Sequence, residues 1–243
     1  MFRHRHAVSD SLTPQDYVGL VLVYLIIGLS LAVALYLEKK GSDRDTRKVV
    51  HIGVGLFVFV WWIFTENWIM LVFFTVPFMI ILFVAMLKDN AISNSKIGDI
   101  ANNKGHKTGL FLYAVSITIM VLFFWDHWTA ATIGIVAMTW GDGFASIVGK
   151  RYGKHKILNG KSLEGSIGVF VATAVMTAVI MLYYSFLITS GYFAGDATAI
   201  IPFWGVAIIA GLIATVLEAI CPGQYDNIVI PVVVAVAMVL LGL

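Results

Sequence analysis

Charged residues are scarce in this sequence, and cysteine is almost absent. Lys, Arg, Asp and Glu make up 12% of the 243 residues, whereas hydrophobic residues make up 60% and the mean hydropathy is +0.91. So little charge excludes an ordinary water-soluble domain and indicates an integral membrane protein. The single cysteine, Cys221, excludes an internal disulfide and a thiolate metal site, which argues against redox chemistry.

Two further patterns are missing. No Ala-x-Ala-like cleavage site follows the first sixteen residues, so the first apolar segment is expected to remain as a helix instead of being removed as a signal peptide. The long apolar runs lack the alternation of a membrane β-barrel. Because backbone groups in lipid have to be hydrogen-bonded within their own segment, each run of about 20 residues is expected to be helical. The sequence therefore predicts an all-α polytopic membrane protein, with one transmembrane domain over 1–243, a short tail over 1–16 and eight spans at 17–37, 49–65, 67–87, 108–125, 128–148, 164–190, 200–220 and 226–243.

The basic residues predict the orientation of these spans. Fourteen of the sixteen Lys and Arg lie in three connections, at 38–48, 88–107 and 150–161, and the alternate connections contain none. Positive charge collects on cytoplasmic loops, so these three connections are expected in the cytoplasm and both termini outside, with only Arg3 and Arg5 in disagreement. The polar groups described below then meet at the cytoplasmic face, where we expect the active site.

The stretch from Gly141 to Gly153 places an acid in an apolar helix. Gly141, Ala145, Gly149 and Gly153 recur every four residues, so one face of the helix lets another backbone or a ligand approach closely. Asp142 is expected near the cytoplasmic end of the fifth helix, where its charge opposes the helix dipole and requires a cation or a metal. An ionised side chain near mid-membrane costs roughly 2.5 to 3.5 kcal/mol, which favours a function for it. Helix packing with one interfacial acid is the alternative.

A second polar segment, 159–166, opens the sixth expected helix. Lys161 and Ser162 lie where the free N–H groups of a helix N-terminus would bind an anion such as phosphate. The segment is not a P-loop, because His155 stands where that motif requires its first glycine and no strand precedes it. The alternative is an ordinary helix start, with Ser162 as N-cap and Glu164 in the first turn.

Two more polar groups are expected at the same face. Arg47 and His51 are four residues apart on the second helix and, together with Lys48, could clamp a polyphosphate. The alternative for Arg47 and Lys48 is a surface anchor whose side chains reach lipid head groups, but His51 lies one turn into the span. Glu218 lies inside an apolar run and requires a partner, whereas Asp226 has a helix N-cap as its default interpretation.

Taken together, these motifs resemble the polyprenol kinase group, which includes dolichol kinase and phytol kinase. The resemblance runs from about residue 44 to the C-terminus, and the order and spacing of the motifs match as well. The motifs are Arg47-Lys48-x-x-His51, Gly141-Asp142-x-x-Ala145-Ser146-x-x-Gly149-Lys150-x-x-Gly153, Lys161-Ser162-x-Glu164-Gly165-Ser166, and Glu218 with Asp226-Asn227-x-x-x-Pro231.

The resemblance implies that a membrane isoprenoid alcohol is phosphorylated to its monophosphate, with CTP as phosphoryl donor and Mg²⁺ as cofactor. In phosphoryl transfer the protein mainly positions the reactants and neutralises phosphate charge. Asp142 is the implied metal ligand, with Glu164 or Asp226, since Mg²⁺ usually takes one or two carboxylates plus substrate phosphates. His51 and Asp226 are both candidates for the general base. The implied nucleotide-binding positions, besides Lys161 on the triphosphate, are Arg47, Lys48, Gly149, Lys150, Arg151, Ser162, Glu164 and Asn227.

The sequence departs from the usual pattern of this family at 99–109, where basic residues replace the common acidic ones, and the acceptor therefore stays open. Diacylglycerol is a second candidate acceptor, and a cytidylyltransferase that makes a CDP-activated lipid is a second candidate activity. A membrane transporter is a further alternative, although the charges gather at one face and no internal repeat is seen. The expected partners are a nucleoside triphosphate, a lipid alcohol and the bilayer, without nucleic acid; a homo-oligomer stays open.

Overall fold

A computed structural model gives the fold of most of the chain. Within the described residues the chain is helical, without a strand, and an isolated bridge joins Lys156 to Ser162. Among these residues six helical segments are long and apolar enough to cross a membrane, and two shorter apolar helices accompany them. The predicted all-α polytopic membrane fold is thus confirmed. The described residues are 11–40, 46–87, 89–102, 108–193 and 197–243.

The helical elements follow the expected spans closely, with one short helix added in the 88–107 connection. In chain order they are α1 (Pro14–Lys39), α2 (Thr46–Val54), two 3₁₀ segments η1 (Gly55–Phe59) and η2 (Trp61–Ile63), α3 (Asn67–Met70), the π-helical η3 (Leu71–Thr75), α4 (Val76–Met86), α5 (Lys96–Asn102), α6 (Gly109–Phe123), α7 (Trp128–Val136), the π-helical η5 (Ala137–Asp142), α8 (Gly143–Tyr152), the 3₁₀ turn η6 (Leu158–Gly160), α9 (Leu163–Thr189), α10 (Phe203–Ile220) and α11 (Asp226–Leu240).

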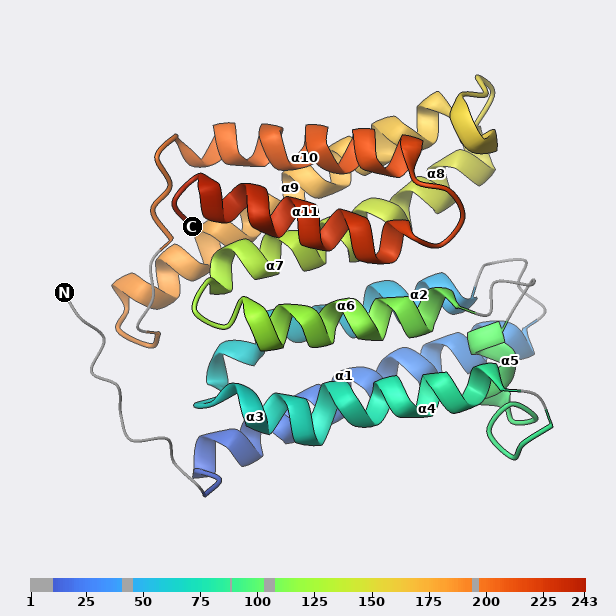
Figure 1. The fold of residues 1–243 in the computed structure, drawn as a ribbon, viewed down its shortest axis with the longest axis horizontal. Helices are drawn as coiled ribbons and strands as arrows, with labels where there is room; N and C mark the ends of the chain where they lie inside the picture. Colours follow the sequence, from blue (N-terminus) through green and yellow to red (C-terminus); the bar gives the residue numbers. More distant parts are fainter. Residues whose placement is uncertain (1–10, 41–45, 88, 103–107, 194–196) are drawn as a thin grey trace.

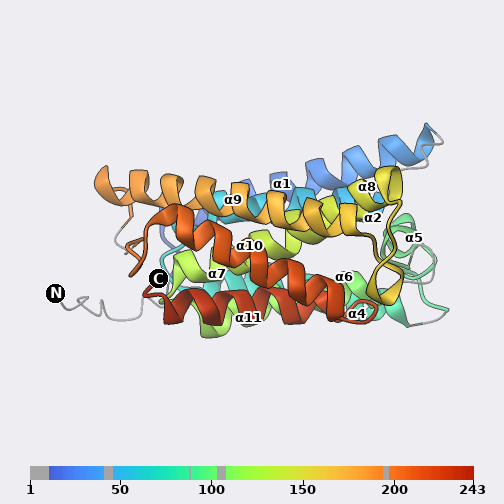
Figure 2. The same ribbon diagram turned by 90° about the horizontal axis from the view of Figure 1, so that it is seen from above.

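The long helices run side by side along one axis of the molecule (Figures 1 and 2). The start of α1 and the C-terminus lie at one end, on the left of Figure 1. The end of α8 and the starts of α2, α9 and α11 lie at the other end, where the expected polar groups would meet. The predicted orientation was argued in part from basic residues that lie outside the described residues: Arg3, Arg5, Arg44, Lys88, Lys104 and Lys107.

Helix α7 lies at the centre of the bundle. All of its residues are buried, because the sequence is apolar or small on every face. Gly134 lets α11 pass close by, since a Cβ at this position would lie 3.1 Å from the Cβ of Ala235. α7 continues without a break through η5 into α8, and so it carries the Gly141–Gly153 motif from the core to the end of the bundle.

The second expected span, 49–65, is helical as far as Ile63, but only its first part is α-helical. After Val54 the backbone forms the two 3₁₀ segments, and carbonyl groups lose their regular partners. In a membrane such groups need other donors. The hydroxyl of Tyr184 donates to the Val58 carbonyl at 3.0 Å, and that of Tyr183 donates to the Phe59 carbonyl at 2.6 Å. Two tyrosines of α9 thus make the irregular backbone tolerable.

The first helix begins at Pro14, so the predicted tail over 1–16 is too long. Thr13 is the N-cap of α1, and its N–H donates to Asp16 at 2.8 Å in a capping box. The other carboxylate oxygen of Asp16 accepts the N–H of Thr65 at 2.8 Å, and the residue is fully buried. Asp16 therefore fastens α1 to the loop before α3.

We expect Asp16→Ala to lower the free energy of unfolding by about 2 kcal/mol, because it leaves the N–H groups of Thr13 and Thr65 without their acceptor. Thermal unfolding in detergent measures the loss. The matched control is Glu38→Ala at the exposed far end of the same helix, which should change stability by less than about 0.5 kcal/mol. Equal effects of the two changes would contradict the role given to Asp16.

Candidate active site

A cavity of about 460 Å³ opens at the end of the bundle where α8 ends and α9 begins. This volume falls in the range of ligand pockets, roughly 300 to 1,000 Å³. Its walls come from α2, the end of η5, α8, the α8–α9 connection, the start of α9, the end of α10, the α10–α11 turn and the start of α11. The charged residues and the amides that line it are Arg47, Lys48, Asp142, Lys150, Lys156, Lys161, Glu218, Gln224, Asp226 and Asn227.

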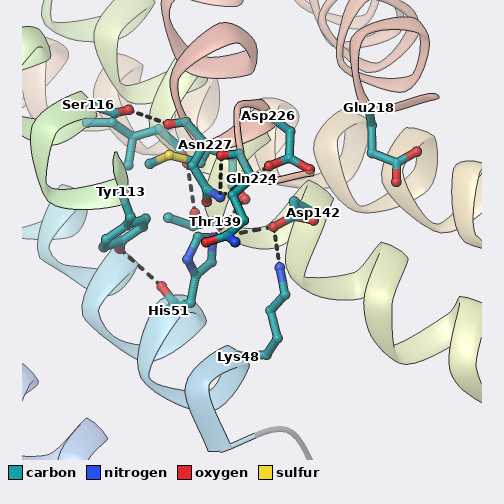
Figure 3. A network of polar contacts seen from close by, with 12 residues as sticks. Lys48, His51, Tyr113, Ser116, Thr139, Asp142, Glu218, Gln224, Asp226 and Asn227 are labelled. Carbon is teal, nitrogen blue, oxygen red and sulfur yellow. Dashed lines mark hydrogen bonds and ion pairs between the residues drawn. The ribbon is translucent and has the colours of Figure 1, made fainter. Parts of the chain in front are cut away.

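Asp142 lies inside a continuous helix and not near its end. It is the last residue of the π-helical segment η5, and α8 continues to Tyr152. The argument that its charge opposes a helix dipole is therefore wrong. The charge is balanced instead by Lys48, whose ammonium group forms a buried ion pair with the Asp142 carboxylate (Figure 3). Lys48 points into the bundle, so the lipid-anchor interpretation is wrong for this residue.

His51 lies behind this ion pair and does not line the cavity. Its Nε2 is 3.9 Å from the Asp142 carboxylate and 3.1 Å from the Met138 carbonyl. The ring of Tyr113 packs on the imidazole with centroids 4.3 Å apart, and its hydroxyl donates to the His51 carbonyl at 3.1 Å. These contacts hold His51 in place next to Asp142, where it can position the carboxylate.

Lys161 forms ion pairs with two acids that are far from it in the sequence. Its Nζ is 3.0 Å from Glu218 and 3.5 Å from Asp226, and it also donates to the Glu218 carbonyl. Asp226 is the first residue of α11 and its side chain faces the cavity, while the N-cap is Tyr225, so the N-cap interpretation of Asp226 is wrong. Glu218 thereby obtains the partner that its place in an apolar run requires.

The start of α9 agrees with the alternative of an ordinary helix start, with Glu164 in the first turn. Ser162 is the N-cap, and its side chain accepts the N–H of Gly165 at 3.2 Å. Glu164 does not line the cavity. Its carboxylate accepts the N–H groups of Lys154 and His155 at 3.1 and 3.3 Å and pairs with the His155 ring at 2.7 Å. The structure therefore does not bring Glu164 together with Asp142.

The small residues of the Gly141–Gly153 motif serve close helix packing. A Cβ at Gly149 would lie 3.2 Å from the Ser162 hydroxyl oxygen, and a Cβ at Gly165 would lie 3.5 Å from the Gly149 Cα. α8 and α9 thus approach each other backbone to backbone. This contact forms the floor of the cavity and brings Lys161 near Asp142, in agreement with the expectation that the polar groups meet at one face.

The remaining predicted cations differ in position. Arg47 and Lys150 line the cavity. The Arg47 guanidinium lies against α6, since a Cβ at Gly109 would come within 2.5 Å of it. Arg151 is exposed outside the cavity, and its guanidinium lies 5.4 Å from the centre of the Tyr152 ring. Arg151 is therefore not placed with the others.

Four polar residues of the cavity were absent from the predicted site: Ser146, Lys156, Glu218 and Gln224. The sequence signal for Glu218 was an acid in an apolar run, but no function was assigned to it. Gln224 gave no signal, because it lies in a turn among polar residues; its side chain accepts a hydrogen bond from Thr108 at 3.0 Å, and its backbone carbonyl accepts the Asn227 amide at 3.1 Å. Gln224 links α6 to the start of α11.

Charges of both signs face this cavity. Ammonium and guanidinium groups bind phosphate oxygens, and carboxylates bind metal cations. One acceptor is unused: the Asn227 side-chain oxygen is buried and has no hydrogen-bond partner among the described residues. Such orphaned buried groups are rare and favour a ligand. The fold and the cavity define an integral membrane protein with a cavity lined by charges of both signs at one end of its bundle.

The comparisons name the family. The sequence is 30% identical over 223 residues to phytol kinase of Synechocystis sp., covering 88% of this chain and 86% of that protein. It is 28% identical over 211 residues to farnesol kinase of Arabidopsis thaliana, covering 82% and 66%. It is 33% identical over 143 residues to CTP-dependent diacylglycerol kinase 1 of Schizosaccharomyces pombe, covering 58% and 63%. No family model and no solved structure matches. The chain belongs to the polyprenol kinase family of CTP-dependent lipid kinases.

Proposed function

We propose that the protein transfers the γ-phosphoryl group of CTP to the hydroxyl of a membrane isoprenoid alcohol. The observation that carries the proposal is the cavity in which Asp142 of η5, Asp226 of α11 and Lys161 of the α8–α9 connection converge at one end of a lipid-embedded bundle. Relatives of this chain are named for kinase activity on phytol and farnesol, and another is a CTP-dependent kinase of diacylglycerol. These names support the proposal that CTP and a lipid hydroxyl meet in this one cavity.

The residues of the cavity fit Mg²⁺. Asp142 and Asp226 supply carboxylate oxygens, and the orphaned side-chain oxygen of Asn227 supplies a neutral one. Oxygen ligands of this kind, completed by phosphates and water, are typical of Mg²⁺ sites. When bound, the ion neutralises charge on the phosphate oxygens. Glu164 is left out of this ligand set, because its carboxylate is bonded to the α8–α9 connection.

The cations of the cavity would hold the triphosphate. Lys161, Lys150 and Arg47 reach it from three sides, and the fork of Arg47 suits a pair of phosphate oxygens. Lys48 is already bound to Asp142, so it serves to orient that carboxylate. Of the two candidates for the general base, Asp226 lines the cavity and His51 does not. We therefore assign proton abstraction from the alcohol to the Asp226 carboxylate oxygen that does not hold the metal, and positioning of Asp142 to His51.

A lipid-transfer assay tests the function. Purified protein in lipid nanodiscs is incubated with Mg²⁺, γ-labelled CTP and, in separate reactions, diterpenoid and sesquiterpenoid alcohols and diacylglycerol. We expect label in the monophosphate of an isoprenoid alcohol. Label only in phosphatidic acid would reassign the acceptor to diacylglycerol, and no lipid label with any acceptor would reject the kinase.

Removal of divalent metal should stop the reaction. We expect EDTA to reduce the rate to background and added Mg²⁺ to restore it, since two carboxylates would otherwise repel the triphosphate. Initial rates over a Mg²⁺ titration measure this dependence. A rate that stays unchanged after EDTA treatment would remove the metal from the account.

We propose further that the cavity faces the cytoplasm. The support is the bias of Lys and Arg toward the connections at this end of the bundle. Lys154→Cys, in the exposed α8–α9 connection, should react with a membrane-impermeant maleimide only from the cytoplasmic side. The wild-type chain is the control, because burial raises the pKa of its only thiol, Cys221, and so slows its reaction at neutral pH. Labelling from the outside would contradict the orientation.

A further inference from the structure

A second cavity lies beside the charged one and is apolar. It has a volume of about 130 Å³ and is enclosed by α1, α2, α4 and α6. Its walls are aliphatic and aromatic side chains, and Thr75 is the exception among its described residues. Ile81 of α4 lines this cavity and is 36% exposed on the outer surface of the bundle, so one wall borders the lipid. Nothing in the phosphoryl-transfer scheme above uses this space.

The two cavities adjoin at the start of α2, where Arg47 of the charged cavity lies against the start of α6. Arg47 lines the charged cavity and its guanidinium lies against Gly109, and the next residue, Leu110, lines the apolar one. On α2, Val50 lines the apolar cavity one helical turn beyond Arg47. Tyr113 is part of the apolar wall and bonds to the His51 backbone behind Asp142. A chain whose hydroxyl sits in the charged cavity therefore has an apolar space directly next to it.

The size of this cavity selects what can enter. An engineered lysozyme cavity of about 150 Å³ binds benzene. A cavity of about 130 Å³ therefore accommodates about one branched isoprene unit and no pair of acyl chains. The remainder of a long tail would leave past Ile81 into the lipid. The dimensions thus favour an acceptor with one methyl-branched chain over a diacylated one.

A competing groove exists on the other side of the site. It measures about 520 Å³ and lies between α8 and α9, lined by Phe144, Gly168 and Ala172 among others. Gly149 and Gly165, whose backbones lie close together, line the charged cavity and not this groove, and we infer that their contact separates the two. A tail lying there would have to pass through that contact.

We propose that the apolar cavity between α1, α2, α4 and α6 binds the isoprene unit next to the hydroxyl of the acceptor alcohol. The proposal rests on the kinase function and adds the subsite that recognises the chain. Binding there holds the hydroxyl at the border of the charged cavity. The methyl branch of the first isoprene unit then determines which alcohols the protein accepts.

A photo-crosslinking experiment tests the subsite without any turnover. The probe is a diterpenoid alcohol with a diazirine on its first isoprene unit, added to the full-length protein in nanodiscs. We expect label on Ala114, Phe78 or their neighbours in the apolar cavity, and competition by the unmodified alcohol. Label on Phe144 or Val171 would move the tail to the α8–α9 groove and overturn the proposal, and so would label that the alcohol does not displace.

A matched pair of substitutions adds a kinetic test. Ala114→Leu fills the apolar cavity and should raise the KM for the diterpenoid alcohol roughly 10- to 200-fold, while the KM for CTP changes less than about twofold. Ala172→Leu adds the same atoms to the competing groove and should leave both constants near wild type. The opposite order of effects would place the tail in the groove.

Enlarging the cavity guards against simple misfolding. Val54→Ala adds room next to Val50, and we expect it to improve the use of an alcohol with an extra methyl on its first unit by about 10-fold relative to the unmodified alcohol. An unchanged ratio would overturn the subsite. If the wild-type protein phosphorylates no alcohol at all, the proposed kinase function is wrong. The crosslinking result alone then shows whether the apolar cavity binds the lipid chain.

Discussion

Asp142→Asn is expected to lower kcat by about 10³-fold or more, with the protein still folded in the membrane. The change keeps the size of the side chain but removes the negative charge. That charge pairs with Lys48 and lies 3.9 Å from His51, and in our account it also binds the metal. The loss therefore falls on the chemical step. Single-turnover rates in nanodiscs measure it, and gel filtration and thermal unfolding verify the fold.

The matched control for this change is Glu164→Gln. Glu164 is another acid at this end of the bundle, in the first turn of α9. Its carboxylate is bonded to His155, and it does not line the cavity. We expect its neutralisation to change kcat by less than about 10-fold, because no transition-state charge is near it. A variant of Asp142 that keeps most of its activity, or a Glu164 variant that loses as much, would remove Asp142 from the metal site.

Lys161→Met is expected to cost both stability and activity. Breaking a buried ion pair by removing one partner destabilises a protein by about 3 kcal/mol, because charge is left unpaired, and here two acids, Glu218 and Asp226, lose their common cation. Activity should fall at least about 10²-fold, since the triphosphate also loses a cation. Thermal unfolding and initial rates measure the two effects.

The double variant Lys161→Met/Glu218→Gln separates these effects. Neutralising Glu218 removes one of the unpaired charges, so we expect stability to return to within about 1 kcal/mol of wild type. The phosphate-binding cation is still missing, and the rate should stay low. If activity returned together with stability, Lys161 would have a structural role only.

The eight spans could be predicted because their signal is local. Each is an apolar run in the sequence, and the described residues form helical segments at these places, six of them long and apolar enough to cross a membrane. The irregular backbone after Val54 could not be predicted, because the groups that satisfy it are the hydroxyls of Tyr183 and Tyr184, more than a hundred residues away. Likewise, the added turns of α8 beyond the expected end of the fifth span moved Asp142 into the interior of a helix.

The site was predicted where residue type and spacing carried the chemistry. Asp142 and Lys161 drew attention as charges in apolar surroundings, and the structure places both in one cavity. The error over Glu164 has a physical cause: its position in the first turn of α9 does not determine its direction, and the N–H groups of the α8–α9 connection bind its carboxylate. The ion pair between Lys48 and Asp142 joins residues 94 positions apart, so no local pattern could reveal it.

The most direct test of the central claim follows two labels through one reaction. Protein in nanodiscs receives Mg²⁺, a diterpenoid alcohol and CTP labelled in parallel reactions at the α- or the γ-phosphate. The account predicts that the γ-label appears in the lipid monophosphate and that the α-label stays in soluble CDP. With Asp142→Asn, no label should reach the lipid and no CDP should form. Release of pyrophosphate, with α-label entering the lipid when a lipid phosphate is supplied, would contradict it and identify a cytidylyltransferase instead.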